Sequence, residues 1–382
     1  MFSFSRENTS PVAKWWRNVD KQILLLFIFL FFLGLFFSFS STTSVMSEKM
    51  NKQTYFFFIK HLFFVSIAFF LLILISIQEK NKLLKYLLYL FIISTFLLFL
   101  TLIVGVEVKG SKRWLDLPLF PLRFQPIELV KPLFVIFVAK IIVLNEKSNL
   151  YSRFTYSFLL LLFILIILIN QPDLGQTLLL SSVWITMIFV SGFNMALLLI
   201  LGLVLIGIIG LLIFFYPDKF GYVFLRIKTF IDPKSGDNFQ SQKALDAIKQ
   251  GGLTGQGMGE GILKEKVPEA HTDYIIAVIS EEFGAIFVLF VVTIFLFLGF
   301  KVLTKVFTKE DEFIKLTLIG LVSLLIIQTF IHIGVNTRLL PTTGMTFPFL
   351  SYGGSSLIGT SIIAGIILNF TRKDIIKYKK NE

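Results

Sequence analysis

The sequence predicts an all-α integral membrane protein, because its apolar runs are too long and carry too few charges for a soluble domain. Of the 382 residues, 55% are hydrophobic and 16% are charged, whereas roughly a quarter of the residues in an average soluble domain are charged. Many of the runs exceed the roughly 18 apolar residues that mark a transmembrane helix. Backbone groups in lipid must pair internally, so these runs are predicted to be helices and not strands.

About ten transmembrane helices are predicted, within a single polytopic membrane domain over residues 22–371. The first apolar run follows Lys14, Arg17 and Lys21, but it has no small-residue cleavage site, so we interpret it as an uncleaved helix. A tight polar turn at 171–173 joins the fifth and sixth helices, and a long loop at about 217–271 separates the seventh from the eighth. The predicted segments are about 22–40, 55–77, 83–106, 126–144, 154–170, 174–191, 195–216, 272–303, 312–337 and 351–371.

The distribution of Lys and Arg predicts that both chain ends are cytoplasmic, since short cytoplasmic segments are enriched in these residues. Basic clusters occur in the tail 1–21, in three later connections and in the tail 372–382. The long loop then lies on the outer side, to which the charge rule for short loops does not apply. The segment 107–131 is short, outer and nevertheless basic, which indicates that its charges have a function.

Several classes of function are disfavoured by composition. The chain has no Cys and only three His, so it has no disulfide or thiol chemistry, and no HExxH zinc motif occurs. The net charge of +12 comes from residues that flank apolar runs, so we predict no nucleic-acid partner. The glycines at every second position from Gly255 to Gly261 do not fit a dinucleotide fingerprint. A loop on, or dipping into, the membrane surface explains them better.

Polar side chains inside the predicted helices are costly and each needs a reason. Glu128 and Lys131 are three residues apart on the fourth helix, hence on one face, where they either form a packing ion pair or serve the substrate. Gln328, His332 and Asn336 form a stripe with a spacing of four that faces the interior of the bundle. Glu281 and Glu282 lie inside the eighth helix, where at least one is expected to meet an interior partner.

The outer loops contain the most unusual residues. Arg113 and Trp114, and then Arg123, form a basic and aromatic segment that leads into the fourth helix. This segment either anchors the chain at the interface or binds an anionic head group through the arginine forks. Asp273 is predicted to lie about one residue inside the eighth helix, either as a cap favoured by the helix N-terminus or as a general base at the membrane surface. A polar, turn-rich segment over 339–356 joins the last two helices.

These segments together resemble the SEDS family (shape, elongation, division and sporulation proteins), over nearly the whole chain from about residue 20. Ala270 and the stretch 344–352 resemble its division branch, FtsW, more than its elongation branch, RodA. Arg338 departs from the pattern, because many members have Gly there. The motifs that carry the resemblance are Arg113-Trp114, Gln125-Pro126-x-Glu128-Leu129-x-Lys131, Gln171-Pro172-Asp173-Leu174-Gly175, Pro268-Glu269-Ala270-His271-Thr272-Asp273, Glu281-Glu282-Phe283-Gly284, Leu339-Leu340-Pro341 and Ser351-Tyr352-Gly353-Gly354-Ser355-Ser356.

The resemblance implies a peptidoglycan glycosyltransferase that polymerises lipid II at the outer face of the inner membrane. In that reaction Asp273 is the expected base, and Arg113, Arg123 and Lys131 are expected to stabilise the leaving undecaprenyl pyrophosphate, with Glu128 orienting Lys131. The configuration at the donor sugar is inverted. The remaining expected substrate-binding residues are His271, Ser351, Gly353 and Gly354. No dedicated metal cage is visible in the sequence, which leaves assistance by Mg²⁺ or Mn²⁺ open.

The resemblance also implies partners and a location. The expected partners are the lipid II substrate, a class B penicillin-binding transpeptidase and other membrane proteins of the divisome, and the expected location is the bacterial inner membrane at the division septum. Three alternatives stay open: a lipid II flippase, which uses the same cavity without a base, a non-catalytic division scaffold, and a RodA-type polymerase that acts in elongation.

Overall fold

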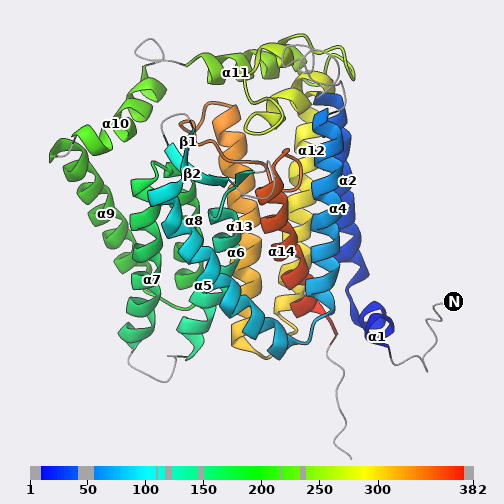
Figure 1. Ribbon diagram of the computed structural model, residues 1–382, viewed down its shortest axis with the longest axis vertical. Coiled ribbons are helices and arrows are strands. Elements are labelled where there is room, and N and C mark those ends of the chain that lie inside the picture. The colour runs from blue at the N-terminus through cyan, green and yellow to red at the C-terminus, as the bar shows by residue number, and fades with distance from the viewer. Residues whose placement is uncertain are drawn as a thin grey trace, which may run out of the picture.

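The protein is a bundle of long, roughly aligned helices, seen in a computed structural model that describes residues 10–41, 56–108, 111–116, 123–144, 150–215, 217–232 and 238–373 (Figure 1). The helices are α1 (Pro11–Asn18), α2 (Lys21–Ser41), α4 (Phe56–Ile77), α5 (Lys80–Val104), α6 (Ile127–Leu144), α7 (Leu150–Asn170), α8 (Leu174–Val190), α9 (Met195–Phe215), α10 (Pro217–Ile231), α11 (Phe239–Gly251), the 3₁₀ turn η1 (Leu263–Lys266), α12 (Ile275–Val306), α13 (Glu312–Asn336) and α14 (Gly354–Thr371).

A helix covers each of the predicted membrane segments. Within the described ranges, seven helices are long and apolar enough to cross a membrane, namely α2, α4, α5, α7, α12, α13 and α14. Helix α8 is shorter, and α6 carries Glu128, Lys131 and Lys140. The integral membrane fold is therefore confirmed, and the number of ten spans stays a prediction.

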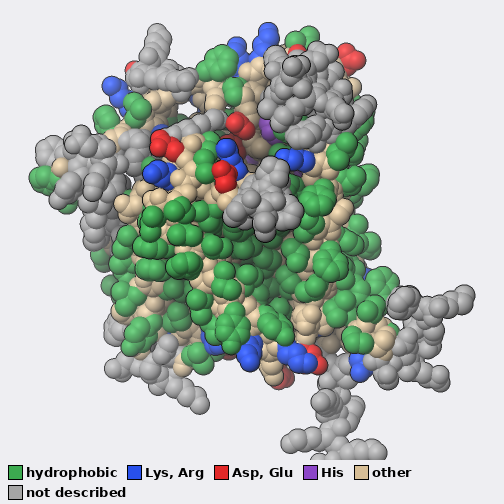
Figure 2. Space-filling view, in the orientation of Figure 1, with side chains coloured by type: hydrophobic (Ala, Val, Ile, Leu, Met, Phe, Trp, Pro, Cys, Tyr) green, Lys and Arg blue, Asp and Glu red, His purple; other side chains and the backbone are tan. Residues whose placement is uncertain are grey.

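Large apolar side chains are exposed around the outside of the bundle. Phe32 of α2 and Phe96 of α5 are each 62% exposed, and Figure 2 shows a broad belt of such side chains with Lys and Arg above and below it. The centre is instead occupied by α6, α13 and α14, most of whose side chains are buried. An exposed apolar belt between two charged ends is the surface expected of a protein surrounded by lipid.

The outer end of the bundle contains elements that hydropathy does not predict. Three short antiparallel strands, β1 (Val106–Val108), β2 (Ser111–Asp116) and β3 (Arg123–Phe124), form a small sheet in the order β1-β2-β3. The long loop predicted at 217–271 is partly helical, since it contains α10, α11 and η1. These elements lie over the upper ends of the long helices (Figure 1).

Helix α12 is broken at Gly284, whose φ of 80° and ψ of 173° are not helical. The glycine-rich segment 251–257 packs into this break and completes its hydrogen bonds. Gln256 and Gly257 donate to the carbonyls of Glu281 and Glu282, while Ala285 and Ile286 donate to Gly252 and Leu253. A Cβ at Gly255 would lie 2.2 Å from the Glu282 carbonyl oxygen. Close backbone approach to α12 therefore accounts for glycine at this position.

Most interior partners of Glu281 and Glu282 come from the same outer loop. Glu281 accepts hydrogen bonds from the amides of Leu263 (2.7 Å) and Lys264 (2.6 Å). Glu282 forms an ion pair with Lys264 and accepts a hydrogen bond from Ser40 of α2. The two carboxylates thus fasten the long loop to α12 immediately before its break, which confirms the expectation of interior partners.

Candidate functional site

A cavity of about 290 Å³ lies at the outer end of the bundle, where the small sheet meets the starts of α6, α12 and α14. Its walls come from segments that are far apart in the chain. They include Val108, Ser111, Arg113, Trp114, Gln125, Glu128, Arg226, Glu269, Thr272, Asp273, Tyr274, His332, Thr342, Gly344, Thr346, Tyr352, Gly353, Ser355 and Ser356. Charged and hydrogen-bonding groups are therefore concentrated in this cavity, beyond the apolar belt of the bundle.

Asp273 lies in the turn that precedes α12 and its side chain lines the cavity. The prediction that it lies one residue inside the helix is wrong, since α12 begins at Ile275 and Tyr274 occupies the N-cap position. The turn is formed by Glu269, which has a φ of 58° and accepts hydrogen bonds from the amides of Thr272 and Tyr274. This tight turn ends the loop and places the Asp273 carboxylate just before the N-terminus of α12.

The backbone around Asp273 is held by a hydrogen bond at three consecutive carbonyl groups. The His271 carbonyl accepts from the Tyr352 amide at 2.9 Å. The Thr272 carbonyl accepts from the Ser351 hydroxyl at 2.6 Å. The Asp273 carbonyl accepts from the Asn336 side-chain amide at 3.0 Å. Three hydrogen bonds from two other segments leave this turn little freedom to shift, so the position of the carboxylate is preorganised.

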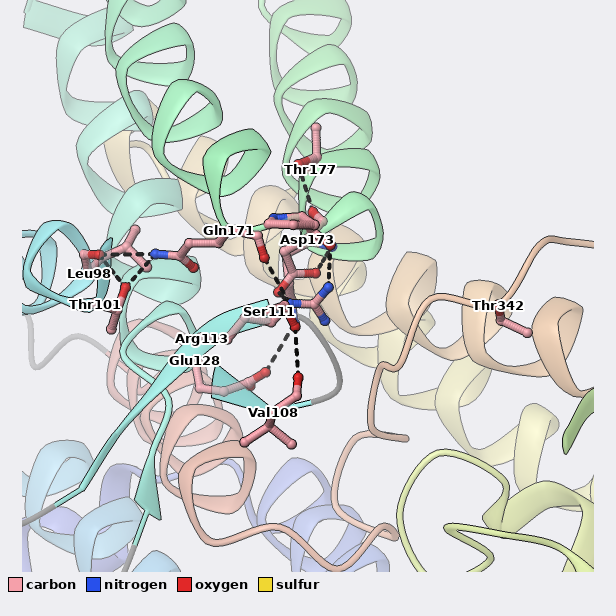
Figure 3. A network of polar contacts seen from close by, with 12 residues as sticks. Leu98, Thr101, Val108, Ser111, Arg113, Glu128, Gln171, Asp173, Thr177 and Thr342 are labelled. Carbon is pink, nitrogen blue, oxygen red and sulfur yellow. Dashed lines mark hydrogen bonds and ion pairs between the residues drawn. The ribbon is translucent and has the colours of Figure 1, made fainter. Parts of the chain in front are cut away.

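Arg113 on β2 points to the turn between α7 and α8 (Figure 3). Its guanidinium donates to the carbonyl groups of Gln171 (3.2 Å) and Pro172 and lies 3.4 Å from the Asp173 carboxylate. Asp173 also caps α8 by accepting from the Gln176 amide at 3.3 Å. Burial raises the pKa of Asp173, and the positive charge of Arg113 opposes that rise. Part of the Arg113 guanidinium is thus held by the turn, and Arg113 also lines the cavity.

Gly344 marks the point at which Asp273 and Arg113 converge. A Cβ added to Gly344 would lie 3.6 Å from Oδ2 of Asp273 and 3.9 Å from Nη1 of Arg113. The residue has a φ of 68°, in the left-handed region that favours glycine. Because glycine adds no side chain here, a carboxylate and a guanidinium border the same space. The carboxylate can accept a proton from a bound hydroxyl, and the guanidinium can stabilise negative charge that develops on a leaving group nearby.

Glu128 and Lys131 form the ion pair expected from their spacing, with 2.9 Å between Nζ and Oε2. Glu128 lines the cavity and also accepts from the Gln176 side chain at 3.2 Å. Lys131 is 2% exposed and donates to Gln328 at 3.3 Å. Two partners for each charge compensate the cost of burying them within the bundle.

The stripe of Gln328, His332 and Asn336 faces the interior, as predicted, and all three side chains are buried. Gln328 donates to the Thr346 carbonyl at 2.9 Å, and His332 lines the cavity. Together with the bond from Asn336 to the turn before α12, this stripe connects α13 to two sides of the cavity.

Comparison with known proteins decides the family. Residues 20–375 match the cell cycle protein family that groups FtsW, RodA and SpoVE. The chain belongs to this family.

Curated relatives within the family are named probable peptidoglycan glycosyltransferase FtsW. The chain is similar to the protein of Caulobacter vibrioides (30% identity over 97% of this chain and 94% of that protein) and to that of Aliivibrio salmonicida (32% identity over 91% and 88%). Among solved structures it resembles a chain of a peptidoglycan synthase complex (TM-score 0.73, 24% identity, 92% and 97% covered) and the rod shape determining protein RodA of Thermus thermophilus (TM-score 0.66, 23% identity, 92% and 96% covered). The solved structures support the family fold.

Of four further residues that were expected to bind substrate, one lines the cavity and the other three, Ser351, Gly354 and His271, do not. Gly353 contributes to the cavity wall. The Ser351 hydroxyl donates to the Thr272 carbonyl and so helps to hold the turn that carries Asp273. Gly354 begins α14 where a Cβ would lie 2.6 Å from the Phe64 ring. The His271 ring packs against Phe57 and Tyr352, with centroids 5.2 and 5.7 Å apart, and burial lowers its pKa, although the charge of Glu269 opposes this.

Arg123 is not brought together with the other cations. It is exposed on β3, at the rim of the sheet, and its Nε lies 3.3 Å from the Asp116 carboxylate. The sequence interpretation gave no role to Asp173 and did not consider Gln176, although both hold charged residues of the site. Their spacing of three residues after a Gln-Pro turn is the signal of a capped helix start. In the part of the chain that the structure describes, no three His, Asp or Glu side chains gather into a metal-binding group.

Proposed function

We propose that this chain is a peptidoglycan glycosyltransferase that polymerises lipid II into glycan strands at the outer face of the membrane. The observation that carries the proposal is the convergence of Asp273 and Arg113 on the space beside Gly344. The names of the FtsW relatives support the reaction type. A lipid substrate with an anionic pyrophosphate and a disaccharide needs a base and a cation at a membrane surface, and the cavity offers both.

In the proposed reaction Asp273 removes the proton from the 4-hydroxyl of the acceptor N-acetylglucosamine. That oxygen forms a bond to the anomeric carbon of the donor N-acetylmuramic acid as the bond to the pyrophosphate breaks. Attack from the opposite face inverts the α-linked donor into a β-1,4 link. Undecaprenyl pyrophosphate leaves with the bonding electron pair, and Arg113 stabilises the charge that develops on it.

The other cations have different roles in this proposal. Lys131 is a positioning residue, because its ammonium group is taken up by Glu128 and Gln328 beneath the cavity wall. Glu128 then presents a carboxylate with a fixed orientation to the sugar. Arg123 is exposed at the rim, where it would meet the anionic head group before the substrate enters.

The test is polymerisation of lipid II by the purified protein together with its transpeptidase partner. Asp273→Asn is expected to lower the rate by about 10²–10⁴-fold, the usual contribution of a general base. Arg113→Ala is expected to lower it by on the order of 10²-fold. Glu107→Gln and Lys112→Ala are matched controls, since both side chains are exposed on the same sheet and neither lines the cavity.

The outcomes separate the candidate functions. Full polymerisation by a folded Asp273→Asn variant would contradict the base assignment. If that variant still moved lipid II across vesicles but no protein preparation made glycan, the flippase alternative would be favoured. Adding EDTA to the same assay tests whether a divalent metal assists the reaction.

We further propose a class B penicillin-binding transpeptidase and other divisome proteins as partners, and the division septum as the location. A solved structure with the same fold belongs to a peptidoglycan synthase complex in which polymerization and crosslinking are coordinated, and the FtsW relatives suggest division. A fluorescent fusion that spreads along the side wall in dividing cells would instead support the elongation alternative.

A further inference from the structure

A second polar cavity lies at the end of the bundle opposite to Asp273. It has a volume of about 330 Å³ and is formed by α1, the turn between α4 and α5, and the end of α14. Helix α14 begins beside the candidate site and ends at this cavity. Its 18 residues span about 27 Å at 1.5 Å per residue, close to the thickness of a hydrocarbon core. The second cavity, called here the basal cavity, is therefore at the other membrane surface.

The described lining of the basal cavity is strongly basic. Lys14, Lys80, Arg372 and Lys373 line it, and the acidic residue among them is Glu79. Glu79 forms an ion pair with Lys82, which lies outside the lining, at 3.1 Å. The described lining thus contains four basic side chains and one carboxylate, a balance of charge that attracts an anion.

Hydrogen bonds connect the three walls of the basal cavity. Arg372 donates to the carbonyl groups of Ile77 (3.2 Å) and Gln78 (2.6 Å), and the Lys373 amide donates to Asn18 at 3.0 Å. The buried indole of Trp15 donates to Ser76. Helix α1 is thereby tied to α4 and α14, so the cations are preassembled before a ligand arrives.

Helix α1 has the character of a helix that lies in the membrane interface. Its Ala13 and Trp15 are buried against the bundle, whereas Val12 and Trp16 are 40% and 36% exposed. Lys21 lies over the Trp16 ring at 5.0 Å. Trp with neighbouring Lys and Arg is typical of the level of the lipid head groups. Figure 1 shows α1 beside the lower ends of α2 and α4.

We propose that the basal cavity binds the phosphate of an anionic phospholipid. Basic pockets between transmembrane helices bind such head groups, and on the predicted topology this surface faces the anionic cytoplasmic leaflet. A lipid is favoured over free phosphate because the cavity lies at the membrane surface and α1, one of its walls, carries exposed apolar side chains outside the lining, Val12 and Trp16, that can meet acyl chains. This site is separate from the candidate catalytic cavity and does not depend on the proposed reaction.

The test measures lipid bound to the full-length protein by native mass spectrometry, in non-ionic detergent micelles titrated with phosphatidylglycerol. Lys14→Gln combined with Lys373→Gln removes two cations of the lining. The affinity is expected to fall about fivefold for each lost charge, hence about 25-fold for the pair. The matched control is Lys85→Gln with Lys301→Gln, which removes the same charge from positions at the same end of the bundle that do not line the cavity. It should bind nearly as the parent does.

Three results would overturn the proposal. One is an equal loss of binding in the two double variants, which would indicate general surface attraction. Another is equal binding of phosphatidylcholine and phosphatidylglycerol by the parent. The third is displacement of phosphatidylglycerol by an equal concentration of inorganic phosphate, which would identify free phosphate as the ligand. If the Gln pair does not fold, Lys14→Arg with Lys373→Arg keeps both charges and must still bind the lipid.

Discussion

Asn336 is the residue whose side chain connects α13 to the turn that carries Asp273. Its Nδ2 donates to the Asp273 carbonyl at 3.0 Å, and its Oδ1 accepts from the Ala277 amide at 3.3 Å. Asn336→Ala is expected to lower kcat for lipid II polymerisation by about 10²-fold, because a shift of about 1 Å in a catalytic group has effects of this size. The KM for lipid II should change much less. Both constants are measured in the polymerisation assay.

The neighbouring residue Thr337 provides the control for Asn336. Its hydroxyl donates to carbonyl groups of α13 itself, so Thr337→Val should leave kcat within about twofold while removing a polar group of similar size. An Asn336→Ala variant that keeps the parental kcat, with a melting temperature that shows it is folded, would mean that the other hydrogen bonds suffice to position Asp273.

Arg338 has a left-handed backbone, with a φ of 57°, and donates from Nη1 to Gln242 of α11 at 2.9 Å. Arg338→Ala loses this hydrogen bond and keeps the backbone strain, whereas Arg338→Gly loses the bond but removes the strain of about 1–2 kcal/mol. The greater freedom of glycine in the unfolded chain offsets part of that gain. The Gly variant is therefore expected to melt at a higher temperature than the Ala variant. The reverse order would show that the backbone at this position is not strained.

At the scale of single residues, the sequence predicts what helical spacing dictates. The ion pair of Glu128 with Lys131 follows from positions three apart on one helix. The contact of Arg113 with Asp173 does not follow, because no spacing rule relates a strand to a turn about sixty residues later. The placement of Asp273 was missed by a few residues, since the start of α12 is decided by the tight turn at Glu269 rather than by hydropathy.

Among the elements, α12 depends on a loop to complete its own hydrogen bonds. A Cβ on Gly284 would lie 2.2 Å from the Leu253 carbonyl oxygen, at a φ of 80° and ψ of 173° that only glycine adopts readily. Gly284→Ala is expected to lower the free energy of unfolding by about 3 kcal/mol or more, from strain and displacement of the loop together. Thermal unfolding in micelles measures the loss.

Gly252→Ala separates backbone strain from displacement of the loop, the two causes of the expected loss at this break. Gly252 also has a positive φ, of 57°, but an added Cβ would meet nothing within 4 Å. Its substitution should cost only the backbone strain, about 1–3 kcal/mol, because its ψ of −142° lies next to the region that is nearly restricted to glycine. Equal losses from Gly252→Ala and Gly284→Ala would contradict the role given to the close approach of Leu253.

The break in α12 also shows why some elements escape prediction. The apolar run from about 272 to 303 is continuous, and an isolated glycine is tolerated within a helix, so nothing local marks Gly284 as the end of a segment. The break is stable because a loop more than twenty residues upstream supplies the missing donors and acceptors. The short strands and α11 are of the same kind, since packing against other elements decides whether they form.

For the molecule as a whole, hydropathy was a reliable guide because lipid imposes the same demand on every span. A helix was found over each predicted segment, and, apart from α12 at its break, each one needs only its own backbone to satisfy its hydrogen bonds. The two polar ends are different, because their cavities bring together side chains from opposite parts of the chain. Motif resemblance, rather than periodicity, was what indicated that Asp273 and Arg113 belong to one site.

The inner end of the bundle contains a joint that is expected to respond to pH. Asp20, between α1 and α2, forms an ion pair of 2.7 Å with Lys305 at the end of α12. Burial raises the pKa of Asp20, but the hydrogen bond and charge of Lys305, with the amides of Ile23 and Gln22, outweigh burial and leave it below the ordinary value of 3.8. The stabilisation is therefore complete above the unfolded-state pKa and is lost as pH falls through the lower folded-state pKa.

Asp20→Asn removes this titration, so we expect its melting temperature to lie below that of the parent near neutral pH, by the equivalent of about 1 kcal/mol for a partly exposed pair. The gap should stay constant down to about pH 5 and close below about pH 4, as the parent loses the charge that the variant never had. Asp246→Asn, in a surface pair with Lys243 at 4.0 Å, is the control and should show almost no gap at any pH. A gap for Asp20→Asn that widens in acid would show that the Lys305 contact does not stabilise the ionised carboxylate.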